Sequence, residues 1–111
     1  MSASKEFIGY ILEMLEPVAD IEGSRFFGGY GIKNNSIQFA MIMGNSLYFV
    51  VGENTRSKYE RLNMKPFSYQ TKNGIRLVKR YYEVPSELFD DSEKLLEWAR
   101  ESITVAKNSS K

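Results

Sequence analysis

The sequence predicts a two-layer α+β domain in which helices pack on a five-stranded antiparallel sheet. Apolar residues recur at helical spacing near both ends of the chain and alternate at strand spacing between them. Three pairs of turn-forming residues, Asn34-Asn35, Gly44-Asn45 and Asn73-Gly74, separate the predicted strands. Because two-residue turns keep hairpin partners adjacent, the strands pair antiparallel. The predicted element order is α-β-β-β-α-β-β-α.

The first element is an amphipathic helix over residues 7–15, with Ser2 or Ser4 as its cap and Pro17 ending the pattern. Strands follow over residues 25–33, 36–43 and 46–51. In the second of these strands, Ile37, Phe39, Met41 and Met43 alternate with Gln38, Ala40, Ile42 and Gly44. One face of the sheet is therefore core and the other is semi-polar.

A short helix is predicted over residues 54–63, seated by Tyr59 and Leu62, and strands over residues 67–72 and 75–84 come after it. The last helix starts after Asp90-Asp91-Ser92, since acids and a capping residue suit the positive end of a helix. Its inward residues are Leu95, Leu96, Ala99, Ile103 and Ala106. Residues 107–111 are expected to fray.

The composition limits the chemistry that the chain can perform. Its 111 residues support a single domain and include neither cysteine nor histidine, so disulfides, Cys/His zinc sites and imidazole triads are excluded. No apolar run approaches the roughly 20 residues of a membrane helix, and the first residues lack a secretory signal. We expect a cytoplasmic protein that is not an enzyme and has no catalytic residue, metal or cofactor.

Residues 25–31 combine three aromatics and three glycines behind Arg25. A phosphate-binding loop is one reading, but the stretch is followed by a turn where a dinucleotide fingerprint requires a helix. The other reading is structural: glycines in a strand indicate special backbone angles or a close neighbour, which the aromatics would supply. Arg25 then stacks on an aromatic or pairs with a helix carboxylate.

Charge is unevenly distributed along the chain. Residues 56–80 hold eight cations and the single acid Glu60, whereas each flank carries a net charge of −3. Interleaved aromatics suit either nucleic acid or an acidic protein surface, although a solvated sheet edge and helix would give the same pattern. The candidate partner-binding residues are Arg56, Lys58, Arg61, Lys72, Arg76, Lys79 and Arg80.

Several landmarks together resemble the N-terminal domain of the TfoX/Sxy family of competence regulators. They are the helix at residues 7–15, Arg25-Phe26-Phe27-Gly28-Gly29-Tyr30-Gly31-Ile32, Phe39-Ala40-Met41-Ile42, Leu47-Tyr48-Phe49, Pro66-Phe67-Ser68-Tyr69, Tyr81-Tyr82-Glu83-Val84-Pro85 and Trp98-Ala99-Arg100. The resemblance implies a secretion-chaperone-like fold over residues 1–107 with a frayed tail at 108–111. It assigns a mainly structural role to Arg25, Phe27, Gly28, Gly29, Gly31, Tyr81, Tyr82, Pro85 and Trp98.

The resemblance also implies a non-enzymatic bacterial regulator of DNA-uptake genes. Longer members act with the cyclic-AMP receptor protein and carry a second, helical C-terminal domain. Here the sequence stops just after the Trp98 helix, so a stand-alone domain and a fragment of a longer protein are both open. The expected partners are such a transcription factor or RNA polymerase, with nucleic acid and a homodimer also open and no membrane. The alternative is a small chaperone-like or dimeric adaptor that binds peptides through its sheet.

Overall fold

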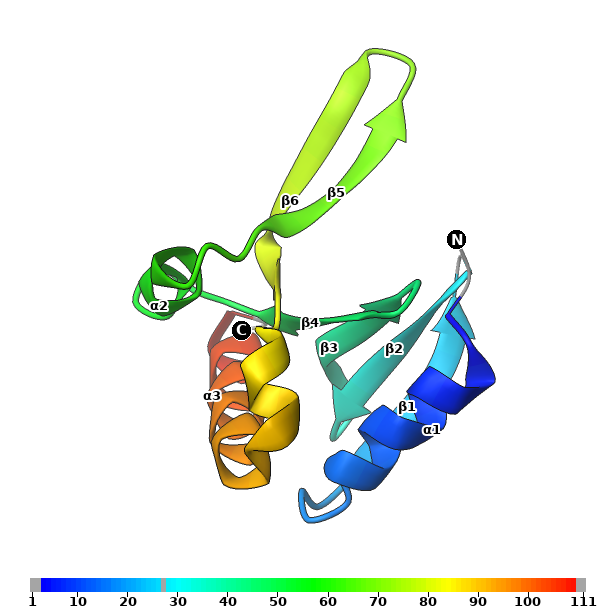
Figure 1. Cartoon of the computed structure of the whole chain (residues 1–111), viewed down its shortest axis with the longest axis vertical. Coiled ribbons are helices and arrows are strands. Elements are labelled where there is room, and N and C mark those ends of the chain that lie inside the picture. The colour runs from blue at the N-terminus through cyan, green and yellow to red at the C-terminus, as the bar shows by residue number, and fades with distance from the viewer. Residues whose placement is uncertain (1–2, 27, 110–111) are drawn as a thin grey trace.

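The structure is a computed structural model that describes residues 3–26 and 28–109. The elements are α1 (Lys5–Met14), β1 (Ile21–Phe26), β2 (Gly29–Asn34), β3 (Ile37–Met43), β4 (Ser46–Val50), α2 (Arg56–Arg61), β5 (Pro66–Thr71), β6 (Gly74–Glu83), a 3-10 turn η1 (Ser86–Asp90) and α3 (Ser92–Ser109). In the described residues the strands form one antiparallel sheet in the order β1-β2-β3-β4-β6-β5 (Figure 1). The predicted α+β class is confirmed.

The sheet has six strands and not the predicted five. The stretch predicted as one strand over residues 25–33 is divided between β1 and β2, which form a hairpin closed by the pair Phe26 and Gly29. Gly28 adopts φ +81° in the reversal, a backbone conformation that side chains other than glycine's disfavour. The glycine-rich stretch is therefore a turn as well as a strand, and β1 begins earlier, at Ile21.

Two of the three predicted turns lie one residue from their predicted positions. The β2–β3 turn is Asn35–Ser36, with φ of 50° and 70°. The β5–β6 turn is formed by Lys72 and Asn73, while Gly74 begins β6. The Gly44-Asn45 turn between β3 and β4 is confirmed. All three connect adjacent antiparallel strands, as two-residue loops require.

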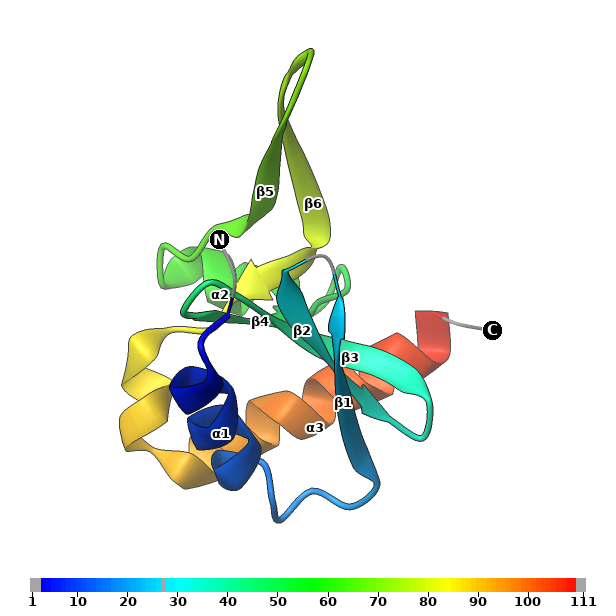
Figure 2. The same cartoon turned by 90° about the vertical axis from the view of Figure 1, so that its right-hand side faces the viewer.

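The three helices bury side chains in one hydrophobic cluster with a single face of the sheet (Figure 2). This cluster contains Ile8 and Ile11 from α1, Tyr59 from α2, and Leu95 and Trp98 from α3. On the sheet it includes Ile32, Phe39, Ala40, Ile42, Leu47 and Phe49. No helix in the described part of the chain is long and apolar enough to cross a membrane.

The predicted alternation in β3 is wrong in part. A register shift opposite Ile32 and Lys33 leaves Phe39 between two paired residues, so that Phe39 and Ala40 are both fully buried. Met41 and Met43 pair with Tyr48 and Ser46 and lie on the face away from the helices. The face of the sheet away from the helices therefore carries methionine and aromatic side chains, although the alternation in the sequence grouped Met41 and Met43 with the core residue Phe39.

The helix boundaries also differ from prediction. Helix α2 is shorter than residues 54–63 at both ends, and in the turn before it the Thr55 hydroxyl accepts from the Gly52 N–H at 2.9 Å. Helix α3 continues through Ser109, beyond the residue where fraying was expected. Its start agrees with prediction, because Asp91 accepts from the Lys94 N–H at 3.2 Å.

Candidate functional site

A two-stranded arm formed by β5 and β6 projects from the body of the molecule (Figure 1). Strand β6 pairs with β4 only through residues 81–83, whereas residues 74–78 pair with β5 alone. Residues 79–81 have no partner on β5, because the register shifts at the junction of Pro66 and Phe67. We call residues 65–80 the basic arm.

The basic arm carries large apolar side chains that are exposed to solvent. Ile75 is 70% exposed, Leu77 53% and Tyr69 45%. Ile75 and Leu77 lie on one face of the arm, and Phe67 and Tyr69 lie on the other with Arg76 and Val78. Exposed apolar groups gathered on a projecting element are typical of a binding surface.

The charge on the basic arm has one sign. It carries Lys65, Lys72, Arg76, Lys79 and Arg80, all of them exposed, and no acidic residue. Because the arm itself contains no acid, these cations create a positive field that attracts acidic partners over about 10 Å at moderate ionic strength. Four of the seven predicted partner-binding residues, Lys72, Arg76, Lys79 and Arg80, therefore lie on this arm.

Contacts at the root hold the arm to the body. The Val51 N–H donates to the Arg80 carbonyl at 2.7 Å, and the Glu83 N–H donates to the Lys65 carbonyl at 3.0 Å. The Tyr82 hydroxyl donates to Glu60 of α2 at 2.8 Å. Burial raises the pKa of Tyr82 and the Glu60 carboxylate adds to that effect, so Tyr82 remains a neutral donor.

The remaining predicted residues lie on α2 and have different environments. Lys58 forms an ion pair with Glu101 at 2.6 Å and lies 4.3 Å from the centre of the Trp98 ring, so it joins α2 to α3. The Arg56 guanidinium is partly buried, and its Nε has no hydrogen-bond partner among the described residues. Arg61 is exposed. Lys58 is thus held by internal contacts and is the weakest candidate for a partner contact.

A groove lies between β5 and the β3–β4 turn, and we call it the arm groove. It has a volume of about 360 Å³ and is lined by Met43, Gly44, Asn45, Ser46, Tyr48, Phe67, Ser68 and Tyr69. The Tyr48 and Phe67 rings meet edge to face at 5.4 Å, and Phe67 stacks on Tyr69 at 6.2 Å. Burial raises the pKa of Tyr48, the carboxylate of Glu83 adds to the rise and the Ser46 hydroxyl opposes it.

Sequence reasoning missed the arm groove. Its lining residues come from two hairpins, and no motif connects them. The available signal was the cluster of aromatic residues in 66–69, which the sequence placed within an ordinary strand.

The structure supports a shaping role for much of the glycine-rich stretch. A Cβ on Gly29 would lie 2.7 Å from the Ile42 carbonyl oxygen, and one on Gly31 would lie 2.5 Å from Gln38 Oε1. Among the described residues, Arg25 donates to the Ala3 carbonyl at 3.5 Å, a partner that the sequence did not predict. Phe27 lies outside the described residues.

The other residues of the family motif have packing or hydrogen-bonding roles. Tyr82, Pro85 and Trp98 are buried in or beside the core. The Tyr81 hydroxyl accepts from Gln38 at 3.1 Å on the opposite face of the sheet. These contacts join β3 to β6 and α2 to α3, which is a structural use of the motif.

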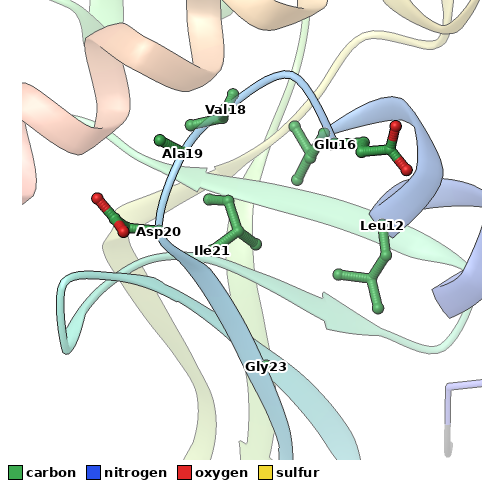
Figure 3. A pocket seen from close by; sticks show the side chains of 8 residues that line it. Leu12, Glu16, Val18, Ala19, Asp20, Ile21 and Gly23 are labelled. Carbon is green, nitrogen blue, oxygen red and sulfur yellow. The ribbon is translucent and has the colours of Figure 1, made fainter.

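A second pocket, of about 460 Å³, lies where the chain passes from α1 into β1 (Figure 3). Leu12, Val18 and Ile21 form apolar walls, and Glu16 and Asp20 are the acids among its lining residues. Within residues 3–26 and 28–109, no group of three or more His, Cys, Asp or Glu side chains is placed to hold a metal ion. This pocket therefore has walls for an apolar group but no set of reactive groups.

The fold and the arm define a two-layer α+β domain whose distinctive surface is a projecting basic hairpin. A comparison with family models matches the TfoX N-terminal domain over residues 13–106. The chain therefore belongs to the TfoX N-terminal domain family, as the sequence landmarks indicated, and membership points to a competence-related regulatory domain. A search of curated proteins finds no match to this chain.

Proposed function

We propose that this protein is a non-enzymatic regulatory interaction domain that controls DNA-uptake genes by contacting the transcription machinery through its basic arm. Family membership supports the regulatory class. The observation that carries the mode of action is the arm itself, with five exposed cations, no acid and apolar side chains left in solvent. The proposed partner is a transcription factor of the cyclic-AMP receptor type or RNA polymerase.

The exposed side chains favour an acidic protein surface over DNA as the arm's partner. A β-ribbon that enters the major groove presents hydrogen-bonding groups to base edges. One face of the arm carries Ile75 and Leu77, whose side chains have no hydrogen-bonding groups. In a complex with DNA these exposed apolar side chains would make no hydrogen bond that reads the bases. Apolar residues ringed by charge suit a protein interface, in which the charges steer association and the apolar groups supply affinity.

A charge-neutralisation experiment tests this function. The triple substitution Arg76→Gln, Lys79→Gln and Arg80→Gln removes three cations from the arm without touching the core. We expect it to weaken binding to purified RNA polymerase or to the receptor-type regulator by about tenfold or more and to reduce the salt dependence of binding. Biolayer interferometry across a salt series measures both quantities.

The matched control removes three exposed cations elsewhere, through Lys5→Gln, Lys33→Gln and Lys94→Gln. This variant has the same net charge as the arm variant, so it should bind within about twofold of the unchanged protein if the arm is the contact surface. Equal binding by all three proteins would show that the arm does not bind these partners. A loss confined to titrations with duplex DNA would favour the nucleic-acid reading instead.

A further inference from the structure

We infer that the arm groove binds an extended acidic peptide segment, which adds as a strand to the outer edge of β5. This inference rests on the proposed function and names the form in which the partner is recognised. It draws on the unpaired edge of β5, the aromatic walls of the groove and the charge of the arm.

The outer edge of β5 offers backbone hydrogen bonds. In a hairpin with a two-residue loop the closing pair, here Thr71 and Gly74, is hydrogen-bonded, and bonded and non-bonded pairs then alternate along the strands. Gln70 and Ser68 consequently direct their N–H and C=O groups away from β6. Both residues are exposed, and β5 is the last strand of the sheet. Such an edge is a template for another strand.

The groove beside that edge supplies side-chain contacts. Tyr48, Phe67 and Tyr69 form an aromatic wall, and Met43 adds a flexible apolar side chain. Ser68 is also among the residues that line the groove, and alternation along β5 places it on the opposite face of the arm from Phe67 and Tyr69. An added strand would place every second side chain against this wall.

The walls of the groove are already held in place. The Ser4 hydroxyl, which caps α1, donates to Asn45 Oδ1 at 3.3 Å and so joins the β3–β4 turn to the helix. On the other side, the edge-to-face contact between Tyr48 and Phe67 fixes the base of the arm against β4. A site that is ordered before binding spends less free energy on immobilising side chains.

Charge selects an acidic occupant. Arg76 is paired with Tyr69 across the strands and lies on the same face, while Lys72 and Lys65 lie at the two ends of β5. Edge-to-edge pairing of two arms would instead bring two sets of five cations together, which like-charge repulsion opposes. The occupant is therefore a segment of an acidic partner and not the arm of a second copy.

A third strand would also stabilise the arm. A two-stranded hairpin is marginally stable in water, whereas three strands with an apolar face can be stable. The arm pairs β5 only with β6 and leaves Tyr69 45% exposed. Strand addition at β5 would cover that side chain and complete a three-stranded ribbon.

The direct test uses the unchanged protein and a synthetic ten-residue peptide in which Glu alternates with Val and Thr. Binding should slow the amide hydrogen exchange of Ser68 and Gln70, measured by NMR, and leave Ile75 and Leu77 on the opposite edge unchanged. A peptide of the same length composed of glutamate alone serves as the charge control. Equal affinity for the two peptides, or no protection at Ser68 and Gln70, would overturn the inference.

Matched proline variants provide the second test. Proline is tolerated in an edge strand where the N–H faces solvent, so Ser68→Pro blocks the edge of β5. The control is Glu93→Pro, because proline is also tolerated in the first turn of a helix and Glu93 lies in the exposed first turn of α3. We expect Ser68→Pro to weaken binding of the alternating peptide by about tenfold, the effect of one lost backbone hydrogen bond and its geometry, and Glu93→Pro to leave it within about twofold. Unchanged binding by Ser68→Pro would overturn the assignment to the edge of β5.

The two proposals fail separately. If the peptide tests are negative while removal of the arm cations still weakens binding to the transcription machinery, the arm acts as a charged surface and strand addition is wrong. If the peptide adds to β5 while neither transcription partner binds, the groove is a peptide site and the proposed function is wrong.

Discussion

Gly29 shows how one missing side chain shapes the sheet. A methyl group at this position would meet the Ile42 carbonyl oxygen at 2.7 Å, and that oxygen belongs to the neighbouring backbone and cannot turn away. The sequence indicated a close neighbour for these glycines, but only the structure identifies which group it is. At Gly29 the neighbours are the Met43 sulfur and the Ile42 carbonyl oxygen, and at Gly31 they are the Gln38 amide and the Phe26 ring. At Gly23 the Tyr30 ring lies against the backbone.

Gly29→Ala should lower the free energy of unfolding by about 1–3 kcal/mol, because the added carbon overpacks two adjacent strands. Chemical denaturation measures the change. Gly9→Ala is the matched control: Gly9 lies on the exposed side of α1 with no atom within 4 Å of an added Cβ. There alanine should stabilise by about 0.5–1 kcal/mol, since glycine costs that much inside a helix. Effects of the same sign at both positions would contradict this account.

Tyr59 contributes a pH dependence to stability. It is fully buried, its hydroxyl has no hydrogen-bond partner in the described part of the chain, and burial raises its pKa, an effect that the neighbouring Ser102 hydroxyl partly opposes. The folded state therefore holds the phenol proton more tightly than the unfolded state. Stability from this group is complete below the unfolded pKa of about 10 and is lost as the pH rises above it.

Tyr59→Phe should raise the free energy of unfolding by up to about 1 kcal/mol at neutral pH, because an unpaired buried hydroxyl is removed. Above pH 10 or so, the variant should lose less stability than the unchanged protein with each further rise in pH. Urea denaturation at a series of pH values compares the two proteins. Parallel stability curves for the two would show that Tyr59 does not titrate during unfolding.

At the scale of elements, the arm behaves differently from the other hairpins. The sequence predicted both of its strands, and their observed bounds are within one or two residues of the prediction. It did not predict that these strands leave the body, since alternation of apolar residues looks the same in a buried strand and in a projecting one. Beyond the irregularity at residues 79–81, β6 pairs with β4 as well as with Pro66 of β5, and a register shift has no signature in composition.

The attachment of the arm depends on Phe67. Phe67→Ala removes the contact with Tyr48 at 5.4 Å and should lower the free energy of unfolding by about 1 kcal/mol. Amides of the arm should exchange faster while those of β2 and β3 keep their rates, because the root is loosened without disturbing the core. Hydrogen exchange by NMR measures both. Leu77→Ala, at a side chain that is 53% exposed, is the control and should change stability by less than about 0.5 kcal/mol.

At the scale of the whole molecule, the charges are segregated. The body carries all of the acids, and the charged residues of the arm are cations alone. Although the net charge of the chain is only +1, the arm is positive and the body is negative. An acidic partner is therefore attracted to the arm and not to the body. The sequence predicted the basic segment of the chain. The fold places a large part of that segment on the β5–β6 arm, where its cations are exposed to solvent.

The arm should not fold without the body. A synthetic peptide of residues 65–83 contains both strands, but it lacks β4, α2 and the contacts at the root. Because isolated two-stranded hairpins are marginal in water, we expect NMR chemical shifts near random-coil values for this peptide. The same residues in the whole chain should show strand shifts, and strand shifts in the free peptide would contradict dependence on the body.

By itself, the sequence determined the α+β class, the antiparallel hairpins, the basic segment and the family. These depend on periodicity, turn residues and local motifs, which act over a few residues and are visible in the chain. The tertiary structure alone decided that a sixth strand forms, that Lys58 is held by α3 while Arg76 is free in solvent, and that Tyr48 meets Phe67 in a groove. Those outcomes depend on register, on sheet order and on which residues distant in sequence come into contact. No local pattern encodes them.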